Sequence, residues 1–213
     1  MLDQIESLNM ELGELVENAK RSLVVIRSGG RGIGAGSIWH SDGLIVTNAH
    51  VTAQGNFEVS LPGGNVHPAK VLASDTDKDI AVLEIDFQDL ETPPLPTIEL
   101  GDSKDLAAGQ WVMALGHPLG VHGAVSMGVI IEVGPDLPEA PQGGREWVAA
   151  SLSLRPGHSG GPLLDSQGRL VGINTIMVGP NVGLAVPVHV VKKFLKDRLG
   201  TGKPEQEILS SVL

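Results

Sequence analysis

Three side chains from distant parts of the 213-residue chain could together form a nucleophilic centre: His50, Asp79 and Ser159. A serine hydroxyl is a poor nucleophile until a neighbouring base takes its proton. An imidazole acts as that base when a buried carboxylate holds it in the correct tautomer. We therefore expect Ser159 to be the nucleophile, His50 the general base and Asp79 the residue that orients His50. The surrounding segments read TNAHV (47–51), DIAVL (79–83) and GHSGGPL (157–163).

The glycines beside Ser159 suit the second requirement of this chemistry, which is a site that stabilises the oxyanion formed during attack. Such a site needs two backbone N–H groups aimed at one point, and a tight turn with few Cβ atoms supplies them. The sequence therefore predicts an oxyanion hole formed by the N–H groups of Gly157 and Ser159.

Residues 157–161 also fit the pattern GxSxG, in which the nucleophile of α/β-hydrolases lies on a strand-to-helix turn. Asp165 and His189 would supply the chain order that this alternative needs. However, the residues after Ser159 favour two strands joined by a turn at 165–168, with no helix. No pair of histidines has the spacing of a zinc peptidase, so we expect neither a metal nor a cofactor.

Short apolar runs separated by turn residues indicate the elements that must position these groups. The chain has 28 glycines and 14 prolines, and its hydrophobic residues are mainly aliphatic. Many short strands at close spacing are typical of an all-β barrel or sandwich. The predicted strands are 23–27, 33–39, 44–47, 57–61, 66–74, 80–85, 111–115, 124–133, 146–151, 162–164, 170–176 and 182–186.

Helical patterns occur only near the two ends of the chain. In residues 1–22 the spacing 4-3-4-3-4-3 predicts an amphipathic helix, either docked on the body or paired with other copies in a short coil. A second helix is expected to begin at Pro187 and to end at Gly200. The seam of the first helix consists of Met1, Ile5, Leu8, Leu12, Leu15, Ala19 and Ser22.

These elements predict four parts of the chain. A helical segment covers 1–22, a first barrel 23–120, a second barrel with the closing helix 121–200, and a tail 201–213. The thirteen residues of the tail are too few for a PDZ domain.

Composition narrows the classes of partner. The net charge of −10 and the lack of a basic cluster argue against nucleic-acid binding. The chain contains no cysteine, and none of its apolar runs reaches the ~20 residues that span a bilayer. Two compartments stay open: Met1 as the native start indicates the cytoplasm, and loss of a targeting segment would indicate an extracytoplasmic protein.

The motifs resemble those of HtrA/Deg-type trypsin-like serine proteases over roughly residues 20–198. The three segments around His50, Asp79 and Ser159 match in order, and His158 stands where that family usually has Asn. His117 likewise stands where Asn or Ser is common. Further matching segments are GAGSI (34–38), LGDS (100–103), GQWV (109–112), LGHPLG (115–120), GINT (172–175) and GLAVP (183–187).

The resemblance implies two six-stranded chymotrypsin-like barrels and a serine endopeptidase that cleaves unfolded or misfolded polypeptides in protein quality control. It also implies a homo-oligomer, with a trimer as the family's arrangement. An alternative is a protein-binding or chaperone-like module whose triad is rarely assembled. The expected substrate pocket has aliphatic walls and no acidic residue, which favours small to medium aliphatic side chains before the scissile bond. Its predicted walls are Leu154, Ile173, Val182 and Leu184.

Overall fold

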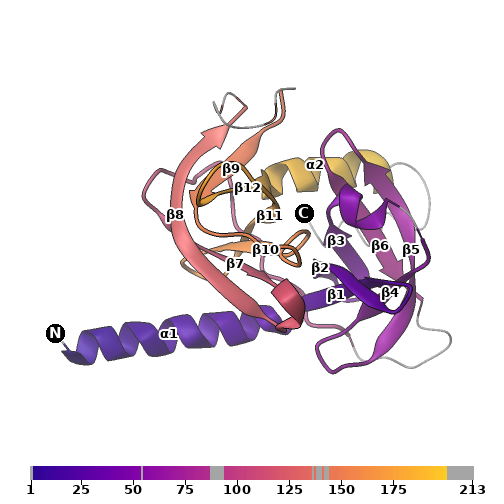
Figure 1. Ribbon diagram of the computed structural model, residues 1–213, viewed down its shortest axis with the longest axis horizontal. Helices are drawn as coiled ribbons and strands as arrows, with labels where there is room; N and C mark the ends of the chain where they lie inside the picture. Colours follow the sequence, from indigo (N-terminus) through magenta and orange to yellow (C-terminus); the bar gives the residue numbers. More distant parts are fainter. Residues whose placement is uncertain are drawn as a thin grey trace.

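The computed structural model describes residues 2–53, 55–86, 94–135, 137, 141 and 144–200, and these form two antiparallel β-barrels with a helix near each end (Figure 1). The first barrel closes in the strand order β1-β2-β3-β6-β5-β4. Its strands are β1 (Leu23–Ser28), β2 (Arg31–His40), β3 (Leu44–Thr47), β4 (Phe57–Ser60), β5 (Val66–Asp75) and β6 (Ile80–Ile85).

The second barrel closes in the order β10-β11-β12-β9-β8-β7, which repeats the connectivity of the first. The prediction of two six-stranded chymotrypsin-like barrels is therefore confirmed. The predicted boundary near residue 120 is wrong, because β7 pairs with β8 and β10 and so belongs to the second barrel. The strands of this barrel are β7 (Trp111–Gly116), β8 (Ala124–Gly134), β9 (Trp147–Ser151), β10 (Pro162–Asp165), β11 (Leu170–Met177) and β12 (Val182–Pro187).

Several strands bury both faces, which explains their continuous apolar runs. Successive side chains of a strand point to opposite faces. On β7, Val112 and Ala114 face the interior of the second barrel, while Met113 and Leu115 join a larger cluster outside it. This larger cluster, the inter-barrel core, contains buried residues of both barrels and both helices. It includes Ala35, Trp39, Val46, Ile80, Val82, Met113, Leu115, Leu164, Ile173, Leu184, Val191 and Phe194.

The helix α2 (Val188–Leu199) packs on the inter-barrel core through Val191, Phe194 and Leu195. It begins one residue later than predicted, because Pro187 is its N-cap in extended conformation, and Gly200 is its C-cap as expected. Two short 3₁₀ helices, η1 (Ala49–Thr52) and η2 (Pro118–Gly120), follow β3 and β7. The tail 201–213 lies outside the described residues.

The helix α1 (Leu2–Lys20) docks on the body only through its second half. Leu12 and Val16 are partly buried against the inter-barrel core, and Ala19 is buried within it. Ile5 and Leu8 are 60% and 41% exposed, and Figure 1 shows this end of the helix extending away from the barrels. In the described chain, neither helix is sufficiently long and apolar to cross a membrane.

Candidate active site

A buried carboxylate holds one imidazole at the junction of the two barrels. Asp79, directly before β6, accepts a hydrogen bond at Oδ1 from the backbone N–H of His50 (2.9 Å). Its Oδ2 lies 2.8 Å from His50 Nδ1. Asp79 is 8% exposed, whereas the side chain of His50 is 45% exposed. The carboxylate therefore fixes both the backbone turn and the ring, and leaves the other edge of the ring free.

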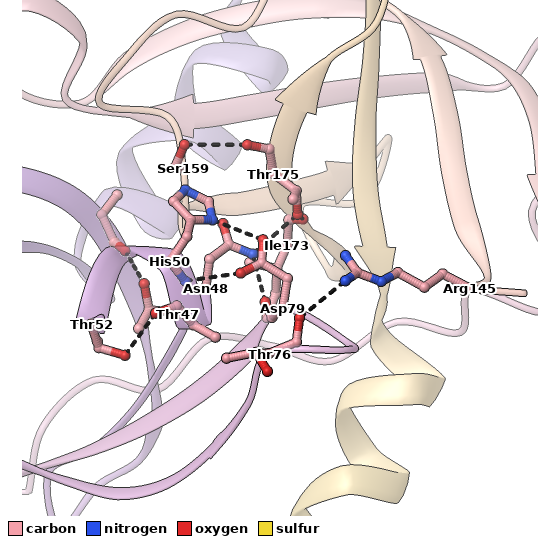
Figure 2. Close-up of polar contacts among 12 residues, drawn as sticks. Thr47, Asn48, His50, Thr52, Thr76, Asp79, Arg145, Ser159, Ile173 and Thr175 are labelled. Atoms are coloured by element: carbon pink, nitrogen blue, oxygen red, sulfur yellow. Dashed lines mark hydrogen bonds and ion pairs between the residues drawn. The ribbon is translucent and has the colours of Figure 1, made fainter. Parts of the chain in front are cut away.

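Ser159 reaches the same junction from the second barrel (Figure 2). Its carbonyl accepts a hydrogen bond from the N–H of Ala35 on β2 (2.8 Å). The N–H of the next residue, Gly160, donates to the backbone carbonyl of Asn174 on β11 (2.9 Å). At Gly160 φ is +83°, and a Cβ there would collide with Thr47 Oγ1 and the Ala35 carbonyl. The turn that carries Ser159 is therefore held between the barrels, and Gly160 is required by a positive φ and by close packing.

The hydroxyl of Ser159 donates to the carbonyl of Thr175 at 3.3 Å, as Figure 2 shows. Among the described residues it forms no hydrogen bond with His50. The structure thus brings His50, Asp79 and Ser159 to one place, with the hydroxyl turned toward β11. Rotation about the Cα–Cβ bond is the movement that redirects a serine hydroxyl.

The segment before Ser159 is a type II turn. The N–H of His158 donates to the carbonyl of Arg155 (2.9 Å), Pro156 occupies the second position and Gly157 has φ +104°. The carbonyl of Gly157 accepts the N–H of His117 (2.8 Å). In the part of the chain that the structure describes, the N–H groups of Gly157 and Ser159 donate to no protein acceptor. Two unpaired donors therefore flank the Ser159 side chain.

Two histidines at this turn, His117 and His158, have depressed pKa values and are neutral at pH 7. Burial lowers the pKa of His117 to about 4; His122 adds to this effect, and the carbonyl of Val24 opposes it. Burial also lowers the pKa of His158, and the Arg155 guanidinium acts in the same direction. The Nδ1 atom of His158 accepts a hydrogen bond from the backbone N–H of Arg155 (3.1 Å).

The structure divides the predicted pocket residues into two groups. Leu154 is partly buried, and a Cβ at Gly183 would contact its Cγ at 3.1 Å. Ile173 and Leu184 are each 1% exposed in the inter-barrel core, so they have no surface for a substrate and the prediction for them is wrong. Val182 is partly buried against that core.

Sequence reasoning missed Met177, whose Sδ lies 3.1 Å from the nitrogen of Leu154. Met177 is the last residue of β11 and pairs with Gly183 on β12. The register of this pairing shifts earlier in β11, between Asn174 and Ile176. This irregularity decides which side chains of β11 face Leu154, and alternation counted along the sequence does not reveal it. No group of three potential metal-ligating side chains is found within the described ranges.

Two closed barrels with His50, Asp79 and Ser159 at their junction define a trypsin-like peptidase domain. Residues 34–173 match the trypsin-like peptidase domain family, and the chain belongs to that family.

Within it, the relatives are HtrA/Deg-type serine proteases. A putative serine protease HhoB of Synechocystis sp. is 33% identical over 84% of this chain and 43% of its own length. Protease Do-like 1, chloroplastic, of Arabidopsis thaliana is 37% identical over 84% of this chain and 42% of its own. The HtrA-type protease AlgW with a decapeptide has a TM-score of 0.76 at 26% identity, covering 88% of this chain and 67% of that one. The chain therefore spans less than half the length of these two curated relatives.

The depressed pKa of His117 predicts that acid destabilises the fold. Between pH 6.5 and about 4 the unfolded imidazole takes up a proton that the folded one does not, so stability is complete above pH 6.5 and falls as the pH decreases. Because the ring is partly exposed, the expected loss is about 2 kcal/mol, and His158 adds to it. Thermal unfolding of wild type and H117N between pH 8 and 4 measures this, and the variant should lose less stability on acidification. Equal losses in the two proteins would contradict the assignment.

Proposed function

We propose that the chain is a serine endopeptidase in which Ser159 attacks the scissile carbonyl, His50 accepts and returns the proton, and Asp79 orients His50. The observation that carries this proposal is the double hydrogen bond of Asp79 to His50 opposite the Ser159 turn. The unpaired N–H groups of Gly157 and Ser159 are the proposed oxyanion hole. Family membership supports the proposal, because the matching family is the trypsin-like peptidase domain and one of the named relatives is a putative serine protease.

Replacing Ser159 with Ala should abolish cleavage of an unfolded protein such as casein, because no other hydroxyl takes the place of the nucleophile. The loss should be at least about 10³-fold in kcat, with Tm within a few degrees of wild type. A fluorophosphonate probe should label wild type at Ser159 and leave S159A unlabelled. Retained cleavage by S159A would overturn the assignment.

A second candidate function is a protein-binding or chaperone-like module whose triad is rarely assembled. The observation in its favour is that the Ser159 hydroxyl donates to Thr175 and not to His50. The fluorophosphonate experiment separates the two candidates, since a resting site of this kind would bind unfolded protein and react with the probe very slowly.

We further propose that substrates are unfolded or misfolded polypeptides with a small or medium aliphatic side chain before the scissile bond. Leu154, Met177 and Val182 would form the apolar walls of the pocket, and Gly183, which has no Cβ, allows Leu154 to pack closely against β12. A substrate Lys or Arg would lose its hydration there without gaining a buried anionic partner.

Cleavage should therefore occur mainly after Val, Ala, Leu or Met, with broad preference, because one methylene changes binding by only about 1–3 kcal/mol. Sequencing the peptides released from a denatured protein measures this. M177A should widen the range of accepted residues toward larger side chains. A majority of cuts after Lys or Arg would disprove the apolar pocket and leave the role of Ser159 intact.

We also propose that the projecting half of α1 associates with the same helix of other copies, with a trimer as the arrangement that family resemblance favours. Ile5 and Leu8 lie on the seam and are exposed, and so short a helix is marginal in water without a partner. The double variant I5E/L8E should lower the molar mass measured by light scattering to that of a monomer. The matched variant E6Q/E11Q, off the seam, should keep the wild-type mass. A monomeric wild type would refute this proposal.

A further inference from the structure

Asn48 is a fully buried polar residue directly before the turn that carries His50, and it bonds to both barrels. Its Nδ2 donates to the carbonyl of Asp79 (3.0 Å) and to Thr175 Oγ1 (3.1 Å). The Asp79 carbonyl can only accept, and the Thr175 hydroxyl already donates its proton to the carbonyl of Ile173 (2.9 Å). Both partners therefore require a donor, which fixes the orientation of the Asn48 amide.

The first of these bonds acts on a strained residue. Asp79 has φ +56°, in the left-handed region that is unfavourable for a residue with a Cβ. This conformation directs the carboxylate toward His50, and the Asn48 amide holds the Asp79 carbonyl in the matching position. Without that donor, the buried carbonyl would favour a different backbone conformation, and the carboxylate would turn with it.

The second bond reaches the other barrel at the strand that contacts the proposed nucleophile. Thr175 lies on β11, and its carbonyl accepts the hydroxyl of Ser159 (3.3 Å). Figure 2 shows Asn48 beside Asp79 and Thr175, with the Ser159 hydroxyl bonded to the carbonyl of Thr175. One amide thus connects the residue that orients the base to the strand beside the nucleophile.

We propose that Asn48 is a positioning residue that sets the relative placement of the His50–Asp79 pair and of Ser159 across the two barrels. The inference rests on the proposed function, in which those three residues act together. Asn48 would touch no substrate, and its effect would be on turnover more than on substrate binding.

The Thr175 hydroxyl allows a matched test of the bridge. T175V keeps the shape of the side chain and removes the acceptor of Asn48, whereas T175S keeps the acceptor and removes a methyl group. T175V should lower kcat about tenfold with KM within about twofold of wild type, and T175S should recover kcat to within about threefold. Assays are made well below the melting temperature of each variant.

N48A should lower kcat about thirtyfold, and the double variant N48A/T175V should be no worse than N48A, because the two residues act through one bond. The control is T52V. It removes a buried hydroxyl of the 3₁₀ helix η1 that, among the described residues, bonds only to the carbonyl of Ala49, so it should lower Tm and leave kcat within about twofold.

A kcat of T175V equal to that of wild type would overturn the inference, as would additive losses in the double variant. Inactive wild type would instead refute the proposed function. An NMR measurement needs no turnover: the His50 Nδ1 proton bonded to Asp79 should give a downfield resonance in wild type and T175S. The signal should broaden or move upfield in N48A and T175V. An unchanged resonance in both would also overturn the inference.

Discussion

Burial of apolar surface between the two barrels is the constraint on which the other features depend. Each barrel has its own interior, yet the inter-barrel core is larger and includes both helices. His50 and Asp79 come from the first barrel and Ser159 from the second, so the site exists only while this core holds the barrels together. Burial of apolar surface stabilises this core by about 25 cal/mol per Å². The hydrophobic effect is non-directional, so it does not fix the position of one barrel relative to the other to a fraction of an ångström.

Directional bonds across the junction supply that placement. The N–H of Ala35 holds the Ser159 carbonyl, and the amide of Asn48 holds Thr175. Both hydrogen bonds are buried. Removing one partner of a buried hydrogen bond lowers the free energy of unfolding by about 1–3 kcal/mol. The apolar core therefore provides the free energy that holds the two barrels together, and a few buried hydrogen bonds select one relative geometry.

The turn from Arg155 to His158 precedes the proposed nucleophile and carries one of two neutral histidines near the site. Two neutral histidines, His117 and His158, lie beside it, and His117 bonds to the carbonyl of Gly157. Their depressed pKa values make the surroundings of the proposed oxyanion hole sensitive to acid. The strained φ of Asp79 lies at the opposite side of the same junction. A residue with positive φ and two histidines with depressed pKa values therefore lie on either side of the proposed site.

Local patterns in the sequence determined most of the architecture. Short apolar runs separated by turn residues placed the strands to within about one or two residues. His50, Asp79 and Ser159 each lie in a short contiguous motif, and the order of these motifs along the chain indicated the chemistry. Only the tertiary structure assigned β7 to the second barrel, moved Ile173 and Leu184 into the core, and brought Met177 to Leu154. It alone showed Asn48 bridging to Thr175. These features depend on strand pairing, an irregularity in β11 and contacts between residues more than a hundred positions apart, and local spacing carries no information about such contacts.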